Sequence, residues 1–156
     1  MDKIISQSLF IIIGAPYLLF LITFDTRWIQ VIIYSIVAIF IHNIIKKQSF
    51  DSNLEFVKRP QGANNCDLCS KDGDQSGKPG FPSGHLTSIV SFFTSIYLLF
   101  PEYRIISLWV GIVYALLMTW SRIHKKCHTL LQTVAGMVLG FSVSVGLESL
   151  INRFKN

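Results

Sequence analysis

Five long apolar blocks, separated by polar segments, dominate this sequence. The blocks cover about residues 4–24, 28–45, 84–100, 105–121 and 129–151. A helix needs roughly 20 predominantly apolar residues to cross a bilayer. The hydrophobic share of 51% and the mean hydropathy of +0.47 agree with such crossings. We therefore expect an all-α integral membrane bundle of about five transmembrane helices, formed by a single domain over residues 1–156.

A long polar loop at about residues 46–83 ends in the segment Lys-Pro-Gly-Phe-Pro-Ser-Gly-His, from Lys78 to His85. Its prolines and glycines prevent a regular element, whereas Ser83 favours a helix start at Ser83 or Gly84. The first amides of such a helix lack internal partners and suit an anion, with His85 in the first turn. The alternative is a loop that ends in a capped helix with an incidental histidine.

Five crossings place the two chain ends on opposite sides of the membrane. The N-terminus, the polar loop and the connection at residues 121–127 then share one side, which holds ten of the 14 Lys and Arg residues. The positive-inside rule predicts that this side is cytoplasmic. The formal charge of +5 does not indicate a nucleic-acid partner, because the cations do not lie on one amphipathic face.

Three short motifs fall on this same side. The first is Lys58-Arg59-Pro60, and the second is Pro82-Ser83-Gly84-His85. The third consists of Ser121-Arg122, five residues, His128, three residues and Gln132. Each is short, but their order, spacing and shared side make them specific together.

This combination resembles the superfamily of type 2 phosphatidic acid phosphatases, which are membrane lipid phosphatases. The pattern of that family is Lys-x6-Arg-Pro, then Pro-Ser-Gly-His, then Ser-Arg-x5-His-x3-Asp. The resemblance covers about residues 58–140. The second motif matches in full, the third matches at Ser121, Arg122 and His128, and the first matches at Arg59-Pro60.

Two positions depart from the family pattern. Ser52 stands where the first lysine is expected, so either Lys58 or a folded-back Lys46 or Lys47 replaces that lysine. Gln132 stands where Asp is usual, and the run from His128 to Gln132 is similar to the His-Thr-x-x-Gln of dolichyl diphosphatases. A glutamine orients a histidine through its carbonyl oxygen but carries no charge.

The resemblance implies a role for each matching residue. His128 would be the nucleophile that forms a phosphohistidine, His85 the general acid and then base, and Gln132 the group that orients His128. Ser121 would either bind phosphate or cap a helix. The expected phosphate-binding residues are Lys58, Arg59, Ser83, Gly84, Ser121 and Arg122.

Neither a metal nor a cofactor is expected, because the sequence has no clustered carboxylates and cations already neutralise the phosphate. Cys66 and Cys69 form one Cys-x-x-Cys, which is half of a zinc site. They are either a disulfide, if the loop faces an oxidising lumen, or two inert thiols. Cys127 is expected to contribute size rather than reactivity.

The predicted function is removal of phosphate from a lipid phosphate or diphosphate in the endoplasmic reticulum or plasma membrane. Gln132 favours a dolichyl-type polyprenyl diphosphate over phosphatidic acid. The alternatives are a lipid phosphotransferase with the same site and a non-catalytic phosphate-binding protein. The charge rule puts the site in the cytoplasm, whereas the dolichyl resemblance implies the lumen. Gly136 and Gly140 predict close helix packing within the monomer, with a homodimer contact as the alternative.

Overall fold

The computed structural model describes residues 2–49, 54–69 and 71–155, and it consists of helices joined by loops. The bundle is built from α2 (Leu9–Thr23), α3 (Arg27–Gln48), α4 (Gly84–Leu99), α5 (Arg104–His124) and α6 (Leu130–Lys155). The short elements are α1 (Asp2–Gln7), η2 (Glu55–Val57) and η3 (Pro101–Tyr103). No strand occurs in the described ranges. Two isolated β-bridges lie in the polar loop. The predicted all-helical membrane bundle is confirmed.

Within the described residues, four segments are long and apolar enough to cross a membrane, one fewer than expected. They are Ile4–Thr23, Arg27–Gln48, Pro101–His124 and Leu130–Lys155. The remaining helix, α4, has 16 residues. It begins at Gly84, as predicted, and it ends before Pro101. The Pro-Ser-Gly-His motif therefore sets the start of α4, and Pro101 sets its end.

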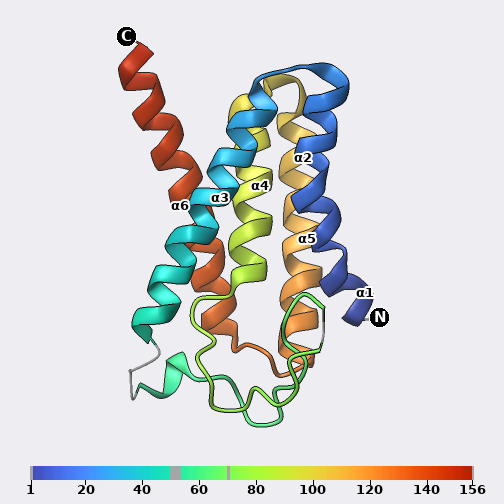
Figure 1. Ribbon diagram of the computed structural model, residues 1–156, viewed down its shortest axis with the longest axis vertical. Helices are drawn as coiled ribbons and strands as arrows, with labels where there is room; N and C mark the ends of the chain where they lie inside the picture. Colours follow the sequence, from blue (N-terminus) through green and yellow to red (C-terminus); the bar gives the residue numbers. More distant parts are fainter. Residues whose placement is uncertain (1, 50–53, 70, 156) are drawn as a thin grey trace.

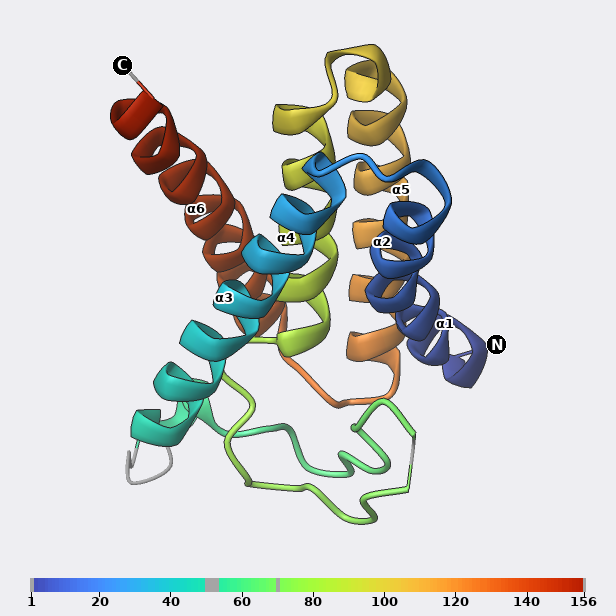
Figure 2. The same ribbon diagram turned by 45° about the horizontal axis from the view of Figure 1, so that its top comes forward.

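The α4 helix lies at the centre of the bundle. It packs against α3, α5 and α6, and most extensively against α6. Figures 1 and 2 show α4 surrounded by these three helices, with α6 tilted away toward the C-terminus. A side chain at Gly136 would collide with the carbonyl oxygen of Ser83, and one at Gly140 with that of Thr87. Glycine therefore permits the close contact of α6 with α4, which confirms the predicted packing within the monomer.

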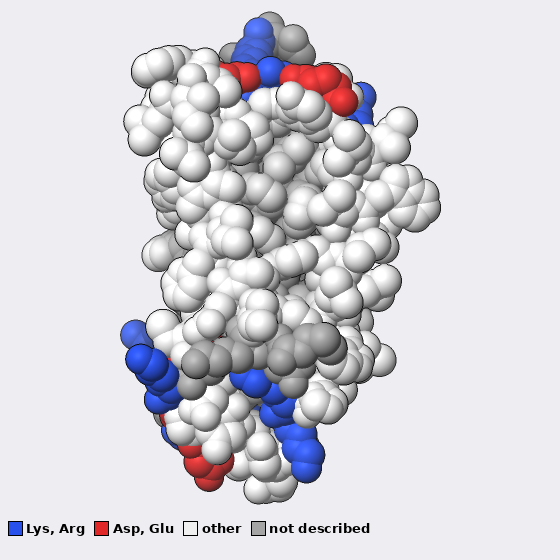
Figure 3. Space-filling view, turned by 90° about the vertical axis from the view of Figure 1, so that its right-hand side faces the viewer, with Lys and Arg blue, Asp and Glu red and all other residues white. Residues whose placement is uncertain are grey.

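The outer faces of the helices carry large exposed apolar side chains. Ile11 and Ile105 are 71% and 74% exposed. On the face shown in Figure 3, charged side chains gather at the two ends of the molecule and leave an uncharged belt between them. Such a continuous apolar surface is unusual for a soluble protein and suits the hydrocarbon of a bilayer. The chain is therefore a multi-pass membrane protein.

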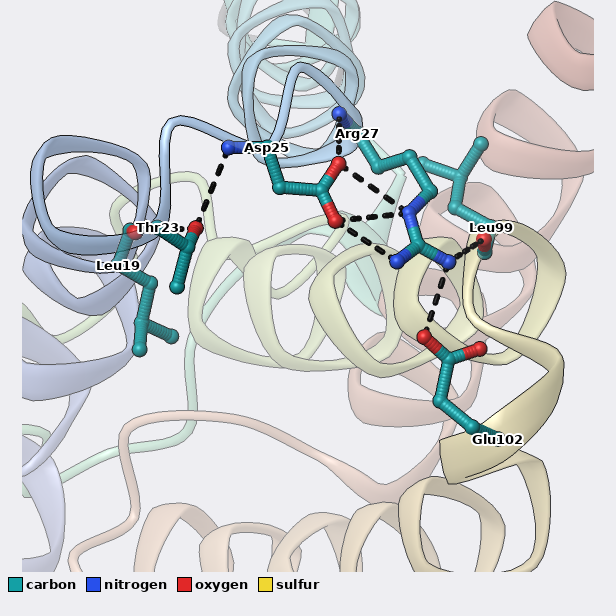
Figure 4. Close-up of polar contacts among 6 residues, drawn as sticks. All are labelled: Leu19, Thr23, Asp25, Arg27, Leu99 and Glu102. Carbon is teal, nitrogen blue, oxygen red and sulfur yellow. Dashed lines mark hydrogen bonds and ion pairs between the residues drawn. The ribbon is translucent and has the colours of Figure 1, made fainter.

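The end without the polar loop is fixed by one ionic cluster, drawn in Figure 4. Arg27 pairs with Asp25 at 2.7 Å and with Glu102 at 2.9 Å, and it also donates to the carbonyl oxygen of Leu99. These contacts join the α2–α3 turn to the start of η3. At the other end, α1, the polar loop and the α5–α6 connection lie together (Figure 1).

Candidate active site

The polar loop folds back on itself to form a cap over one end of the bundle. We call residues 54–69 and 71–83 the cap loop. Its two arms are joined by backbone hydrogen bonds: Arg59 N donates to Lys78 O at 2.9 Å, and Gly80 N donates to Val57 O at 2.8 Å. A side chain at Gly80 would collide with Arg59 Cγ and Gln132 Oε1, so only glycine fits there. The cap loop therefore has a defined structure that positions Arg59.

The start of α4 is held from two sides. Ser83 N donates to the carbonyl oxygen of Gln132 on α6 at 2.9 Å. His42 Nε2 on α3 donates to the carbonyl oxygen of Pro82 at 3.2 Å. The imidazole of His42 also lies directly against Gly84, where a Cβ atom would come within about 3 Å of the ring. The first turn of α4 is thus fixed between α3 and α6.

A cavity of about 310 Å³ lies between this helix start, α3 and the cap loop. Four residues of the sequence motifs line it: Arg59, Gly84, His85 and His128. They come from the cap loop, from α4 and from the α5–α6 connection, so folding joins three distant parts of the chain. The other polar or charged side chains in its wall are His42, Asn43, Lys46, Asp67, Asp72, Gln75 and Ser88.

The imidazole of His128 is oriented by Gln132. His128 Nδ1 lies 3.2 Å from Gln132 Oε1. A carbonyl oxygen can only accept, so Nδ1 carries the proton and Nε2 has the free lone pair. Gln132 Nε2 donates to the carbonyl oxygens of Phe56, Val57 and Lys58 at 2.8–3.2 Å. These three acceptors fix which end of the amide faces His128.

Burial keeps His128 neutral. The side chain is 4% exposed. Burial, together with repulsion from Arg59 and Arg122, lowers the pKa of His128 to about 3, and the hydrogen bond with Gln132 opposes this shift. A neutral imidazole with its lone pair on Nε2 is the form that can act as a nucleophile.

Two buried donors have no hydrogen-bond partner among the described residues. One is Nη1 of Arg59, which lines the cavity, and the other is the hydroxyl of Ser83, which is not a lining residue but precedes the cavity-lining Gly84. Ser83 occupies the N-cap position of α4 but makes no capping hydrogen bond. Arg59 is 8% exposed, and burial lowers its pKa while the carboxylates of Asp72 and Asp67 oppose this change. An unsatisfied buried donor is costly unless a ligand completes it, so Arg59 at the cavity wall favours an anion there.

Arg122 completes the cationic side of the site. It is fully buried at the end of α5. Its Nη1 donates to the carbonyl oxygen of Cys66 at 3.2 Å and lies 3.4 Å from His85 Nε2. Arg122 therefore connects the cap loop to the imidazole on α4.

The geometry combines a neutral histidine, a second histidine, buried arginines and an open helix start. A family model for the PAP2 superfamily matches residues 27–155. The chain belongs to the PAP2 superfamily. Membership implies phosphatase-type activity on lipid phosphates, so the protein is a membrane hydrolase. Comparison with curated proteins and with solved structures gives no match.

The first PAP2 motif differs from the expectation for Lys58. Lys58 Nζ pairs with Glu55 at 3.2 Å on the protein surface, and Lys58 does not line the cavity. The extended backbone of Lys58 turns its side chain away from Arg59, its neighbour. Lys46, at the end of α3, lines the cavity instead. The sequence signal for this role is a lysine in the last turn of an apolar helix. It is easily missed because Lys46 lies 13 positions before Arg59, farther than the family motif spacing.

The serine of the third PAP2 motif, Ser121, lies in the last turn of α5 rather than in the described wall of the cavity. Ser121 is fully buried in the last turn of α5 and is not among the cavity-lining residues that the structure describes. Its carbonyl oxygen accepts a hydrogen bond from Lys125 N at 3.1 Å. Ser121 lies at the end of a helix, so it does not cap a helix start.

The cysteines pair differently from the expectation. Cys66 of the cap loop forms a disulfide with Cys127, and Cys69 is a free, exposed thiol. The sequence suggested Cys66 and Cys69 as partners because only they are close in the chain. In the folded PAP2 domain the cap loop lies on the α5–α6 connection, where Cys66 meets the residue before His128. Cys127 therefore anchors the cap rather than merely filling space.

Proposed function

We propose that this PAP2 protein removes the terminal phosphate of a lipid phosphate or diphosphate through a phosphohistidine on His128. The observation that carries the proposal is the hydrogen bond from His128 Nδ1 to Gln132 Oε1. It leaves the lone pair of Nε2 free in a neutral ring at the wall of the cavity that Arg59 also lines, and Arg59 Nη1 is a buried donor without a hydrogen-bond partner among the described residues.

The first step forms a bond between His128 Nε2 and phosphorus, while the bond from phosphorus to the leaving oxygen breaks. Arg59, Ser83 Oγ and the first amides of α4 would hold the phosphoryl oxygens. Lys46, which also lines the cavity, would add a point charge. These cations neutralise the developing charge, so the proposed steps need no metal ion.

His85 would supply the proton for the leaving oxygen. An incoming phosphate favours the imidazolium of His85 through its negative charge. In the second step, water attacks phosphorus and gives its proton to His85, and the phosphorus–nitrogen bond breaks to return the electron pair to Nε2. The products are free phosphate and a lipid alcohol, or a lipid monophosphate when the substrate is a diphosphate.

The shape of the cavity supports a lipid substrate. Apolar side chains of α2 and α3 (Leu9, Ile13 and Ile39) form part of the cavity wall. A smaller pocket between the same helices shares Ile13, Ile39 and Ser88 with it. A phosphate in the cavity could therefore keep its hydrocarbon tail between α2 and α3, within the bilayer. Our hypothesis for the substrate is a polyprenyl diphosphate. It rests on Gln132, which matches the dolichyl diphosphatase pattern.

The disulfide supports a location of the site on an oxidising side of the membrane. Disulfides persist in the endoplasmic reticulum, outside the cell and in the bacterial periplasm, whereas cytosolic thiols stay reduced. The positive-inside rule points the other way. However, Lys46 and Arg59 line the cavity and Arg122 is buried beside it, so these cations serve the site rather than the topology.

The test is a phosphate-release assay of the full chain in detergent with phosphatidic acid, polyprenyl phosphate and polyprenyl diphosphate. We expect His128→Ala to lower the rate by about 10³-fold or more, since it removes the nucleophile. Vanadate should inhibit the wild type, and a chelator should not. Unchanged phosphate release by His128→Ala would exclude the mechanism. Phosphate transferred to a second lipid instead of released would show a phosphotransferase.

A further inference from the structure

A side chain outside the three motifs contacts the second histidine. Ser6 Oγ on α1 lies 3.2 Å from His85 Nε2. Ser6 is fully buried and His85 is 7% exposed. The match to the PAP2 family begins at residue 27, so this contact comes from a part of the chain that lies outside the matched region.

The position of α1 is fixed by packing. α1 packs against α5, and Leu9 at the start of α2 is 2% exposed. This packing places the Ser6 hydroxyl beside His85. The hydroxyl of Ser8, between α1 and α2, bonds elsewhere: it donates to the carbonyl oxygen of Ile5 at 2.7 Å and contacts the hydroxyl of Tyr114 on α5.

Ser6 differs chemically from the other group at His85 Nε2. Arg122 Nη1 lies 3.4 Å from that nitrogen, and a guanidinium can only donate. It therefore favours the neutral ring. A hydroxyl can donate to Nε2 when the ring is neutral and accept from Nε2–H when the ring is protonated. Ser6 is thus able to hold the imidazole in both protonation states.

The charged surroundings of His85 make such a partner important. The cations that act on it are Arg122, Lys125 and Arg59, and the ring of His128 is also near. Across the shared cavity lie His42 and Lys46 of α3 and the carboxylates of Asp67 and Asp72. The nearest groups are positive or neutral, so the imidazolium of His85 depends on the bound phosphate and on an uncharged acceptor.

We infer that α1 completes the active site and that Ser6 is a positioning residue, whose oxygen accepts from Nε2–H of the His85 imidazolium while the proton on Nδ1 is given to the leaving oxygen and regained from water. The inference rests on the proposed function, in which His85 is the general acid and base. Ser6 itself forms no bond to the substrate and transfers no proton to it.

The test compares Ser6→Ala, Ser6→Thr and Ser8→Ala in the full chain, with phosphatidic acid in mixed micelles between pH 5 and 9. We expect Ser6→Ala to lower kcat about tenfold at neutral pH, with KM within about twofold of wild type. This is the effect of losing one hydrogen bond in the transition state. The alkaline limb of its pH–rate profile should move to lower pH, because the protonated ring loses its acceptor. Ser6→Thr should recover most of kcat, since it keeps the hydroxyl.

Ser8→Ala is the matched control, because it removes a hydroxyl from the same segment that bonds elsewhere. It should leave kcat and the pH profile near wild type. A wild-type profile for Ser6→Ala would overturn the inference, and so would an equal loss of kcat in Ser8→Ala, which would indicate packing alone. Thermal stabilisation by vanadate checks that each variant is folded. If the threonine does not fit, the pH profiles of folded Ser6→Ala and Ser8→Ala still distinguish the two outcomes.

Two further variants separate this inference from the proposed function. Loss of activity in both His85→Ala and His128→Ala, with Ser6→Ala unchanged, would refute the role of Ser6 alone. Full activity in the two histidine variants would refute the proposed function, and the role of Ser6 with it.

Discussion

His128 Nδ1 and Gln132 Oε1 lie 3.2 Å apart, and the same glutamine side chain donates to three carbonyl oxygens of the cap loop. One amide thus fixes the imidazole and holds the cap. An aspartate in this place could orient the ring and stabilise its charge, but it has no N–H group for the cap. The departure from the usual motif therefore has a structural reason in this chain.

Gln132→Glu should lower both activity and stability. The carboxylate would lie against the carbonyl oxygens of Phe56, Val57 and Lys58, and such unpaired buried groups cost ~1–3 kcal/mol each. We expect a lower thermal midpoint in detergent and a rate at least about tenfold lower, because a misplaced catalytic group is costly. Equal or higher activity in Gln132→Glu would contradict the double role of this amide.

Lys46 and Lys58 should respond differently to substitution by alanine. Lys46 lines the cavity, whereas Lys58 pairs with Glu55 at the surface. A hydrogen bond to a charged group contributes ~1.5–3 kcal/mol, so Lys46→Ala should raise KM about tenfold or more. Lys58→Ala is the control and should stay within about twofold, as expected for a surface ion pair. Steady-state measurement of KM for the two variants decides between the two lysines. A larger increase of KM in Lys58→Ala than in Lys46→Ala would restore Lys58 as the motif lysine.

Loss of the Cys66–Cys127 disulfide should loosen the cap. The bond joins residues 61 positions apart and brings Cys66, whose carbonyl oxygen accepts from Arg122, onto the α5–α6 connection. Removal of a native disulfide typically costs about 2–5 kcal/mol. Cys127→Ser, or treatment with a reductant, should therefore lower the thermal midpoint and the activity. Cys69→Ser should do neither, and an equal effect of Cys69→Ser would argue against this pairing.

Cys69 provides a natural test of membrane orientation. It is exposed, and the other two cysteines are bonded to each other. If the site faces an oxidising compartment, a membrane-impermeant maleimide should label intact cells when the protein lies in the cell-surface membrane. If the protein instead lies in the endoplasmic reticulum, the maleimide should label sealed, inside-out vesicles from that membrane. Cys69→Ser gives the background, and labelling from the cytoplasmic side alone would contradict the proposed orientation.

Stability should decrease as the pH falls toward the low pKa of His128. The folded pKa is about 3, below the ordinary value of 6.5. Between these values the unfolded chain binds a proton that the folded protein does not bind. This group therefore stabilises the fold fully above about pH 6.5 and loses its contribution progressively as the pH falls to about 3. The thermal midpoint of His128→Gln should depend less steeply on pH between 6.5 and 4 than that of wild type, and parallel slopes would refute this assignment.

The all-helical membrane fold could be predicted from the amino-acid sequence alone. Apolar blocks of membrane length can satisfy their backbone groups in lipid only as helices, so this conclusion needs no distant contact. The start of α4 at Gly84 and the close packing at Gly136 and Gly140 also follow from local signals, namely a breaker segment and small residues one turn apart.

The set of side chains that meet around the cavity could not be predicted without the three-dimensional fold. Lys46 instead of Lys58, Cys127 instead of Cys69, and the contact of Ser6 with His85 all depend on how the cap loop and α1 fold back onto the helix ends. The physical reason is that the partners in each contact are separated by many residues, and motif spacing describes only the neighbours along one helix or turn. The hydrogen bonds from Gln132 to the carbonyl oxygens of Phe56 and Lys58 could not be predicted either, because the cap loop has no periodic sequence pattern from which its path follows.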